Sequence, residues 1–184
     1  MSLIRLFFQL LFLRVGPEDM PAGTRPVYTA LGFYLVVGLL LDQVVASEAG
    51  FGAGLVLLGT DAAVLALYSA GLAMAWGHRP RIPQMLTALY GATAMLGLVA
   101  WPLVAMQPTG GEAVDVDSAV GLWSMLMIAL FAWNLVVLGQ IYRRTLGLNA
   151  AIGMLIALGY FILSSLVYMA LATQMLPGET GLPS

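Results

Sequence analysis

Residues 51–76 read FGAGLVLLGTDAAVLALYSAGLAMAW, and residues 77–81 continue with GHRPR. Asp61 is the single charged residue of the first stretch. Because about 20 consecutive apolar residues suffice for a helix to cross the hydrocarbon core of a bilayer, this stretch predicts a transmembrane helix. The basic residues after it predict a turn on the cytoplasmic side of the membrane.

Four further apolar runs of this kind lie at about 26–46, 84–106, 119–142 and 149–175. The seven basic residues counted as lysine or arginine are all arginines and lie on one side of the five runs: Arg5, Arg14, Arg25, Arg79, Arg81, Arg143 and Arg144. The connections at 47–48 and 107–118 and the residues after Pro177 contain none. Since basic connections remain in the cytoplasm, this alternation predicts a cytoplasmic N-terminus and an extracytoplasmic C-terminus.

The predicted fold is therefore all-α, a polytopic integral membrane bundle of five transmembrane helices preceded by an interfacial N-terminal helix. We expect residues 1–25 to form that helix and a polar elbow, residues 26–176 the transmembrane domain, and residues 177–184 a short extracytoplasmic tail. Basic residues that are all arginine, with abundant alanine and glycine, are typical of a high-GC bacterium. We therefore expect the protein in the bacterial inner membrane.

Composition excludes several functional classes. Hydrophobic residues make up 61% of the chain and charged residues 9%, whereas a soluble domain is roughly 45–50% apolar and about 25% charged. The net charge of −2 and the absence of a dense basic cluster argue against nucleic-acid binding. The lack of cysteine excludes disulfides and thiolate metal sites, and the single His78 excludes a bis-histidine haem. We predict no cofactor and no metal site.

The N-terminal stretch SLIRLFFQLLFLRV, residues 2–15, is too short to cross the membrane. Gly16-Pro17 after it predicts a helix stop, and Arg5 and Arg14 bracket its apolar part. We expect this helix to lie at the inner interface or against a partner, with its apolar residues covered there: Leu3, Ile4, Leu6, Phe7, Leu10 and Leu11.

Asp61 is the one ionisable residue deep within the apolar runs, about 15 Å from the nearer end of its helix at 1.5 Å per residue. A carboxylate at this depth is expensive and is a functional candidate by default. The runs contain no buried basic residue that could pair with it. Three states remain open: a neutral acid satisfied by hydroxyl groups, a contact with another subunit, and a group that handles protons or ions.

Other polar residues within the runs are candidate partners of Asp61. By depth, Thr93, Ser164 and Ser165 reach a similar level, and Tyr68 lies two turns away on the same helix face. Asn134 lies deeper toward the cytoplasm, and we expect it to join helices without touching Asp61. Asp42 is expected at a solvated helix end.

Two roles are open for the arginines. They determine the topology of the chain, or they bind the phosphate groups of lipids. These apply to Arg5, Arg14, Arg79, Arg81, Arg143 and Arg144. On the opposite side, the connection at 107–118 carries Glu112, Asp115 and Asp117. It lacks the later bidentate glutamate of a calcium loop, so a solvated acidic loop is expected.

The sequence predicts no catalytic residue, because it contains no nucleophile–base pair, phosphate-binding glycine loop or HExxH motif. We expect a non-catalytic integral membrane protein, an accessory or scaffold subunit that binds other membrane proteins or itself. The small residues Ala62, Ala66 and Ala70, spaced by four, suit close helix packing. The alternative is a small ion- or solute-permeating membrane protein that uses Asp61.

The cytoplasmic N-terminus, the polar elbow that begins at Gly16-Pro17, and the five closely spaced runs resemble the Yip family of membrane proteins, which interact with Rab/Ypt GTPases, and its bacterial relatives. The resemblance covers most of the chain in layout. It implies a non-enzymatic role in membrane organisation or in the assembly of complexes, and it transfers no site residue.

Overall fold

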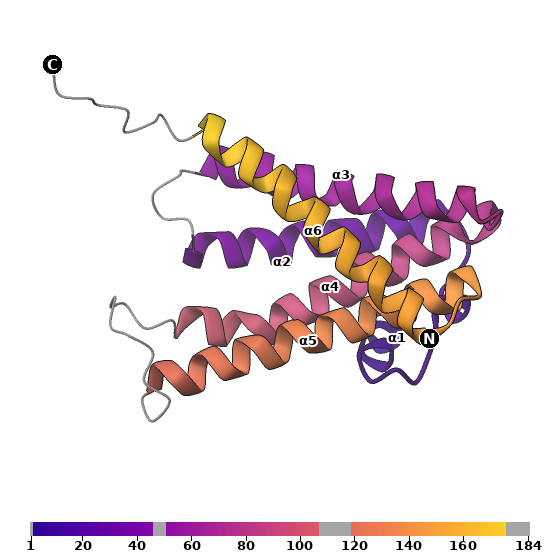
Figure 1. Ribbon diagram of the computed structural model, residues 1–184, viewed down its shortest axis with the longest axis horizontal. Coiled ribbons are helices and arrows are strands. Elements are labelled where there is room, and N and C mark those ends of the chain that lie inside the picture. The colour runs from indigo at the N-terminus through magenta and orange to yellow at the C-terminus, as the bar shows by residue number, and fades with distance from the viewer. Residues whose placement is uncertain (1, 46–50, 107–118, 176–184) are drawn as a thin grey trace, which may run out of the picture.

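The computed structural model describes residues 2–45, 51–106 and 119–175. Five long apolar helices follow a short N-terminal helix, as the sequence predicts (Figure 1). The elements are α1 (Leu3–Leu11), η1 (Pro17–Asp19), α2 (Thr24–Val45), α3 (Phe51–Ala75), η2 (Arg79–Arg81), α4 (Ile82–Ala105), α5 (Ala119–Leu146) and α6 (Ala150–Met175). The acidic connection at 107–118 and the expected tail at 177–184 lie outside the described residues.

Each of the five long helices contains a segment long and apolar enough to cross a membrane. The segments are Thr24–Asp42, Phe51–Ala75, Arg79–Ala105, Gly121–Leu146 and Ala150–Leu171, with mean hydropathy between 1.4 and 2.2. Most of their surface is uncovered by the chain itself, since only 17–39% of each hydropathy window is buried. Apolar side chains exposed over five whole helices need lipid around them, so this is a polytopic membrane protein.

Two of the connections between long helices are short turns that begin with glycine in the left-handed region. Gly77 after α3 has φ +76°, and Gly147 after α5 has φ +68°. The next residue donates its N–H to a carbonyl five residues earlier, His78 to Ala73 at 2.7 Å and Leu148 to Arg143 at 3.0 Å. These bonds satisfy the last helix carbonyls, which is why both helices stop where the arginines cluster.

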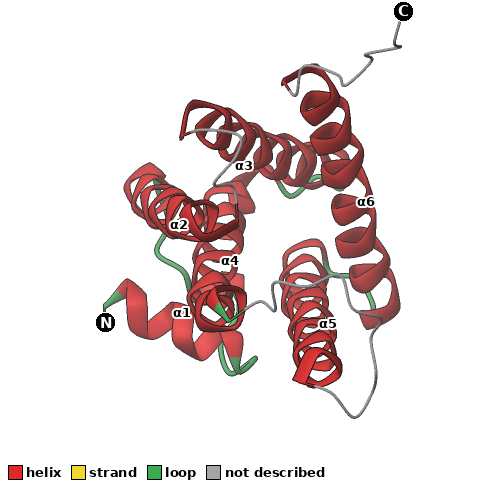
Figure 2. Cartoon of the chain, turned by 90° about the vertical axis from the view of Figure 1, so that its left-hand side faces the viewer, coloured by secondary structure: helices red, strands yellow, loops and turns green. Residues whose placement is uncertain are grey.

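The long helices form a ring in the order α2, α4, α5, α6 and α3, as the view along the bundle shows (Figure 2). Helix α2 packs along α4, α4 along α5, and α3 also touches α4. Helix α6 leaves α5 near their shared turn and crosses obliquely to α3 (Figure 1). Because α6 is oblique, it moves away from α5 along its length, and the interior of the ring is incompletely filled by helix–helix contacts.

Helix α1 lies crosswise to the long helices and packs on α4 (Figure 2). Its buried face consists of Leu6, Phe7, Leu10 and Leu11. The Phe7 ring stacks on Phe33, with ring centroids 6.3 Å apart and planes 5° from parallel, and it lies over Gly91, where a Cβ would overlap it. From the sequence, we expected lipid or a partner to cover six apolar residues of this segment. The structure shows that the chain's own bundle covers four of the six.

The opposite face of α1 remains apolar and exposed, through Ile4, Phe8 and Phe12. Phe8 and Phe12 are in ring contact, with centroids 5.0 Å apart. The elbow then turns under the bundle, where Met20 is buried and its carbonyl accepts a hydrogen bond of 2.9 Å from Gln84 Nε2 of α4. Helix α1 and the elbow are therefore attached to the end of the bundle that carries the arginine turns.

Candidate functional site

The most highly connected polar residue within the long helices is Asp61 on α3. Its Oδ2 accepts a hydrogen bond from the Tyr34 hydroxyl of α2, and its Oδ1 accepts one from the Ser164 hydroxyl of α6. The Tyr160 hydroxyl of α6 lies 3.0 Å from Oδ1 and 3.2 Å from Oδ2. Through these hydroxyl groups, Asp61 on α3 is hydrogen-bonded to both α2 and α6.

Tyrosines also support the helices around Asp61. The Tyr90 hydroxyl of α4 donates to the carbonyl of Ala62 at 2.8 Å, and its ring contacts that of Tyr34 at 5.4 Å between centroids. The Tyr68 hydroxyl donates to the carbonyl of Ile156 at 2.8 Å. Since Tyr90 and Tyr68 bond backbone carbonyls on α3 and α6, they set the spacing of the helices that carry the Asp61 cluster.

A second hydroxyl pair closes the interior toward the arginine turns. Ser69 Oγ and Tyr142 Oη are 2.8 Å apart and both residues are fully buried. The Tyr68 ring lies between those of Tyr142 and Tyr160, at centroid distances of 6.3 and 6.2 Å. These three aromatic rings lie between Asp61 and the arginine turns. The space described next lies on the Asp61 side of the rings.

That space consists of three adjoining cavities. The first, the Asp42 cavity, has a volume of about 300 Å³ between α2, α3 and α6. The second, the Val37 cavity, has about 380 Å³ between α2, α3, α4 and α5. The third, the Asn134 cavity, has about 500 Å³ between α3, α4, α5 and α6.

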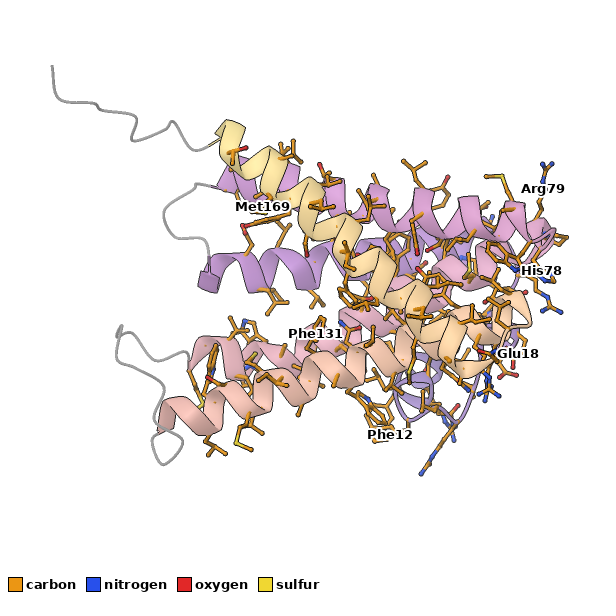
Figure 3. All side chains as sticks on the ribbon, viewed as in Figure 1. Phe12, Glu18, His78, Arg79, Phe131 and Met169 are labelled. Atoms are coloured by element: carbon orange, nitrogen blue, oxygen red, sulfur yellow. The ribbon has the colours of Figure 1, made fainter. Side chains whose placement is uncertain are left out.

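The cavities share polar residues at their borders. Asp61, Ser164 and Tyr168 line both the Asp42 and the Asn134 cavities. Thr93 and Asn134 line both the Asn134 and the Val37 cavities. Phe131 on α5 lines the Val37 cavity and Met169 on α6 lines the Asn134 cavity, and Figure 3 shows them on these two helices. Asp61 therefore lies where two of the three cavities meet.

Asp42 lies at the other end of the Asp42 cavity from Asp61. Its carboxyl group packs directly on Gly54, where a Cβ would overlap it, and both residues line the cavity. Gly54 and Asp61 are seven positions apart on α3, which corresponds to roughly 10 Å along the helix. Asp42 is partly exposed, which is compatible with the solvated helix end expected from sequence, and the cavity has a carboxyl group near each end.

Two polar atoms at the Asn134 cavity have no hydrogen-bond partner within the described part of the chain. They are Thr93 Oγ1 and Asn134 Oδ1, and both atoms are buried. A buried polar atom without a partner costs on the order of 1–3 kcal/mol, so such atoms are rare in folded proteins. Both residues line the Asn134 cavity, and rotation of either side chain would turn its unpartnered atom toward a guest.

Of the residues proposed from sequence as partners of Asp61, Ser164 makes a direct hydrogen bond. Thr93, Asn134 and Ser165 line the Asn134 cavity together with Asp61. Tyr68 bonds the backbone of α6 instead. Asn134 makes no direct bond to Asp61, as expected, although the two share one cavity.

The sequence did not single out Tyr34 and Tyr160, although both donate to Asp61. Each lies near the middle of its helix, about ten residues from the nearer end. Tyrosine is usually found at membrane interfaces, so a tyrosine at mid-depth is itself a signal that a polar partner is close.

The proposed headgroup or topology residues lie in the turns near α1 and the elbow, and His78, Arg79 and Glu18 are grouped at that end in Figure 3. Arg81 donates to the carbonyl of Thr145 at 3.2 Å, and Arg143 to Gln140 at 3.0 Å. Arg144 pairs with Glu18. Arg5, Arg14 and Arg79 are exposed. In the described ranges, no three His, Cys, Asp or Glu side chains gather as metal ligands.

Fold and site define a class: a polytopic membrane protein whose five long helices surround cavities with a carboxyl group at their junction. Comparison with protein-family models, with curated proteins and with solved structures gave no match.

Proposed function

We propose that this protein binds a small ion or solute at Asp61 and allows it to permeate the membrane. The observation that supports this most directly is the position of Asp61 at the junction of the Asp42 and Asn134 cavities. A carboxyl group at mid-membrane depth is expensive to insert and, where it lines a cavity, typically belongs to a substrate or ion pathway. The path then runs from Asp42 along α3 to Asp61.

The arrangement corresponds to a state open on one side. The Asp42 cavity begins near the end of α2 and reaches Asp61, whereas the group of Tyr68, Tyr142 and Tyr160 fills the interior beyond it. Permeation requires these rings to separate, which a tilt of α6 relative to α3 would achieve, because Tyr68 is on α3 and Tyr160 on α6. Helix rocking of this kind is how membrane transporters alternate access to a central site.

Orientation follows from the charges. With the arginine turns in the cytoplasm, the Asp42 end faces the extracytoplasmic side, and Asp61 receives its solute from there. The resemblance to bacterial membrane proteins and the all-arginine composition support the bacterial inner membrane as the location.

The test is flux through the full chain in proteoliposomes, measured for H⁺, Na⁺ and K⁺ and for small organic solutes. Asp61→Asn should abolish a flux that the unchanged protein supports. Glu18→Gln is the matched control, since it removes a carboxylate that is exposed and lies away from the Asp61 cavities. Flux that is the same for the unchanged protein, Asp61→Asn and empty liposomes would remove permeation as the function.

A second candidate is the accessory subunit expected from sequence and implied by the Yip-like layout. The observation that favours it is an outer face of α3 on which Gly59 and Ala63, four positions apart, are exposed, with nothing within 4 Å of a Cβ at Gly59. Small residues spaced by four allow another helix to approach closely. Gly59→Leu should then release a stoichiometric partner, or a second copy, that co-purifies in mild detergent. A protein that is strictly monomeric and without a partner contradicts this candidate.

A further inference from the structure

Two residues that line the Asn134 cavity carry polar atoms without a hydrogen-bond partner in the described structure. Asn134 Oδ1 is an acceptor only, and Thr93 Oγ1 can accept through its lone pairs. Neither has a partner in the described structure. A guest that satisfies Asn134 Oδ1 must bring a hydrogen-bond donor, and Thr93 Oγ1 can accept a second one.

Asp61 has room for one more donor. An ionised carboxylate offers about four lone-pair sites on its two oxygens. The hydroxyls of Tyr34, Ser164 and Tyr160 supply one proton each, because the Tyr160 proton is shared between the 3.0 and 3.2 Å contacts. Three protons for four sites leave an acceptor position on a carboxyl group that lines the Asn134 cavity.

The charge balance points to a cation. Asp61 and Asp42 line one cavity, and no arginine, lysine or histidine occurs between residues 26 and 77, between 82 and 142, or after 144. A carboxylate in a low-dielectric interior is stabilised when an opposite charge lies close to it. Because the chain carries no basic residue at this depth, an ionised Asp61 takes its counter-charge from a ligand.

Size and lining distinguish an organic cation from a metal ion. A volume of about 500 Å³ is in the range of pockets for small organic molecules. Its walls combine the oxygen atoms with apolar groups from Leu138, Phe161 and Met169. The rings of Tyr160 and Phe161 border the same cavity, with 5.3 Å between their centroids, and aromatic rings attract ammonium groups over their faces. A bare ion would leave the apolar part of this space empty.

We propose that the Asn134 cavity binds a small organic cation with a primary ammonium group and an apolar body. The ammonium group has three N–H donors, which match three acceptors: one on Asp61, and those of Asn134 and Thr93 once these two side chains turn toward the guest. The apolar body packs on Leu138, Phe161 and Met169. This assignment rests on the proposed binding of a solute at Asp61 and specifies its chemical class.

The experiment uses the full chain in lipid nanodiscs and equilibrium binding of 2-phenylethylamine, with 2-phenylethanol as the uncharged analogue and Na⁺ as the inorganic cation. Asn134→Leu removes an acceptor and fills the cavity without touching the hydrogen bonds of Asp61. Thr93→Val removes one hydroxyl at constant volume. The matched control is Thr87→Val, because Thr87 lies on the same helix as Thr93, bonds that helix at the carbonyl of Pro83 and lines none of the three cavities.

We expect saturable binding of the amine, weakened at least about tenfold in Asn134→Leu and several-fold in Thr93→Val, since a hydrogen bond to a charged group is lost in each. Thr87→Val should bind the amine as the unchanged protein does, and the alcohol should bind at least about tenfold more weakly. Asp61→Asn should abolish binding of the amine wherever the variant retains the helix content of the unchanged protein.

The outcomes separate the two proposals. Equal affinity for amine and alcohol overturns the cationic class while leaving a solute site at Asp61. Na⁺ that binds at the same site more tightly than the amine overturns the organic class and leaves an ion site. Absence of saturable binding for all three probes overturns the assignment, and together with absent flux it removes the proposed function as well.

Discussion

Arg144 at the end of α5 donates a hydrogen bond to Glu18 of the elbow, with 3.2 Å between Nη1 and Oε1, across 126 positions of sequence. The arginine side chain is 31% exposed and that of the glutamate 54%. The same elbow is bound to α4 through Gln84 and Met20. The N-terminal segment is therefore attached to both helices at the arginine end, by one ion pair and by apolar and amide contacts.

We predict that Glu18→Gln changes the free energy of unfolding by less than about 1 kcal/mol, because exposed ion pairs contribute little. The measurement is unfolding in mixed micelles at low and high salt. The unchanged protein should be slightly less stable at high salt than at low salt, because salt screens the ion pair. The stability of the variant should not show this difference. A loss of several kcal/mol would mean that the elbow depends on this pair more than on the buried Met20.

Gly91→Ala should displace α1, because the added Cβ overlaps the Phe7 ring and that ring is 2% exposed and stacked on Phe33. Overpacking of this kind costs typically about 1–3 kcal/mol. The chain has no cysteine, so a single Leu10→Cys substitution reports the contact by its reactivity with a maleimide. Labelling should be slow in the Leu10→Cys protein and several-fold faster when Gly91→Ala is added.

The control for this displacement is Gly32→Ala on α2, since nothing lies within 4 Å of a Cβ at Gly32. It should leave the labelling of residue 10 unchanged. Similar rates for both alanine variants would contradict the packing of Phe7 over Gly91.

Tyr34→Phe removes one of the three hydroxyl donors of Asp61 and keeps the ring contact with Tyr90. Hydrogen bonds between membrane helices contribute about 0.6 kcal/mol on average and about 1.7 at most in measured cycles, so we expect a loss in this range. Tyr28→Phe is the control, because Tyr28 is 70% exposed on the same helix. Equal effects of the two substitutions would rule out a specific contribution of the Tyr34–Asp61 bond.

The orientation predicted from the arginines is tested by reporter fusions. A reporter placed within residues 77–83 should be active in the cytoplasm, and one fused after Ser184 should be active on the extracytoplasmic side. The two points lie on opposite sides because three helices, α4, α5 and α6, separate them, which is an odd number of crossings. Reversed signals would turn the bundle over and place the mouth of the Asp42 cavity in the cytoplasm.

Helix α1 gives a depth prediction. Spin labels at Ile4, Phe8 and Phe12, the exposed apolar face, should show contact with lipid at shallow depth. Labels at Leu6 and Leu10 should be protected by α4. This periodicity distinguishes a helix between bundle and lipid from a helix that crosses the bilayer, for which every label would show deep burial.

Much of the fold could be predicted because its signals are local. An apolar run long enough to span, a glycine that ends a helix and the Gly16-Pro17 break each act within a few residues. The expected runs therefore agree with the observed helices to within a few residues at most described ends: the first was expected from 26 and begins at Thr24, and the second begins at Phe51 as expected.

The candidate site could be predicted only in part. Asp61 stands out because a charge in an apolar run is conspicuous, and Ser164 follows from counting residues inward along antiparallel helices. Depth alone does not say which residues face one another, so Tyr68 was favoured while Tyr34 and Tyr160 were missed. Depth and rotation about the helix axis are both needed to pair side chains.

The sequence by itself determined five membrane helices, a set of arginines that all lie on one side of them, and a carboxyl group at mid-depth. Only the tertiary structure decided that three hydroxyls surround that carboxyl, that cavities meet there, and that Phe7 packs on Gly91. The physical reason is that lipid and helix interiors are similarly apolar, so hydrophobicity places a helix in the membrane without choosing its neighbours. Neighbours are chosen by shape and by hydrogen bonds between helices, which exist only once the bundle has formed.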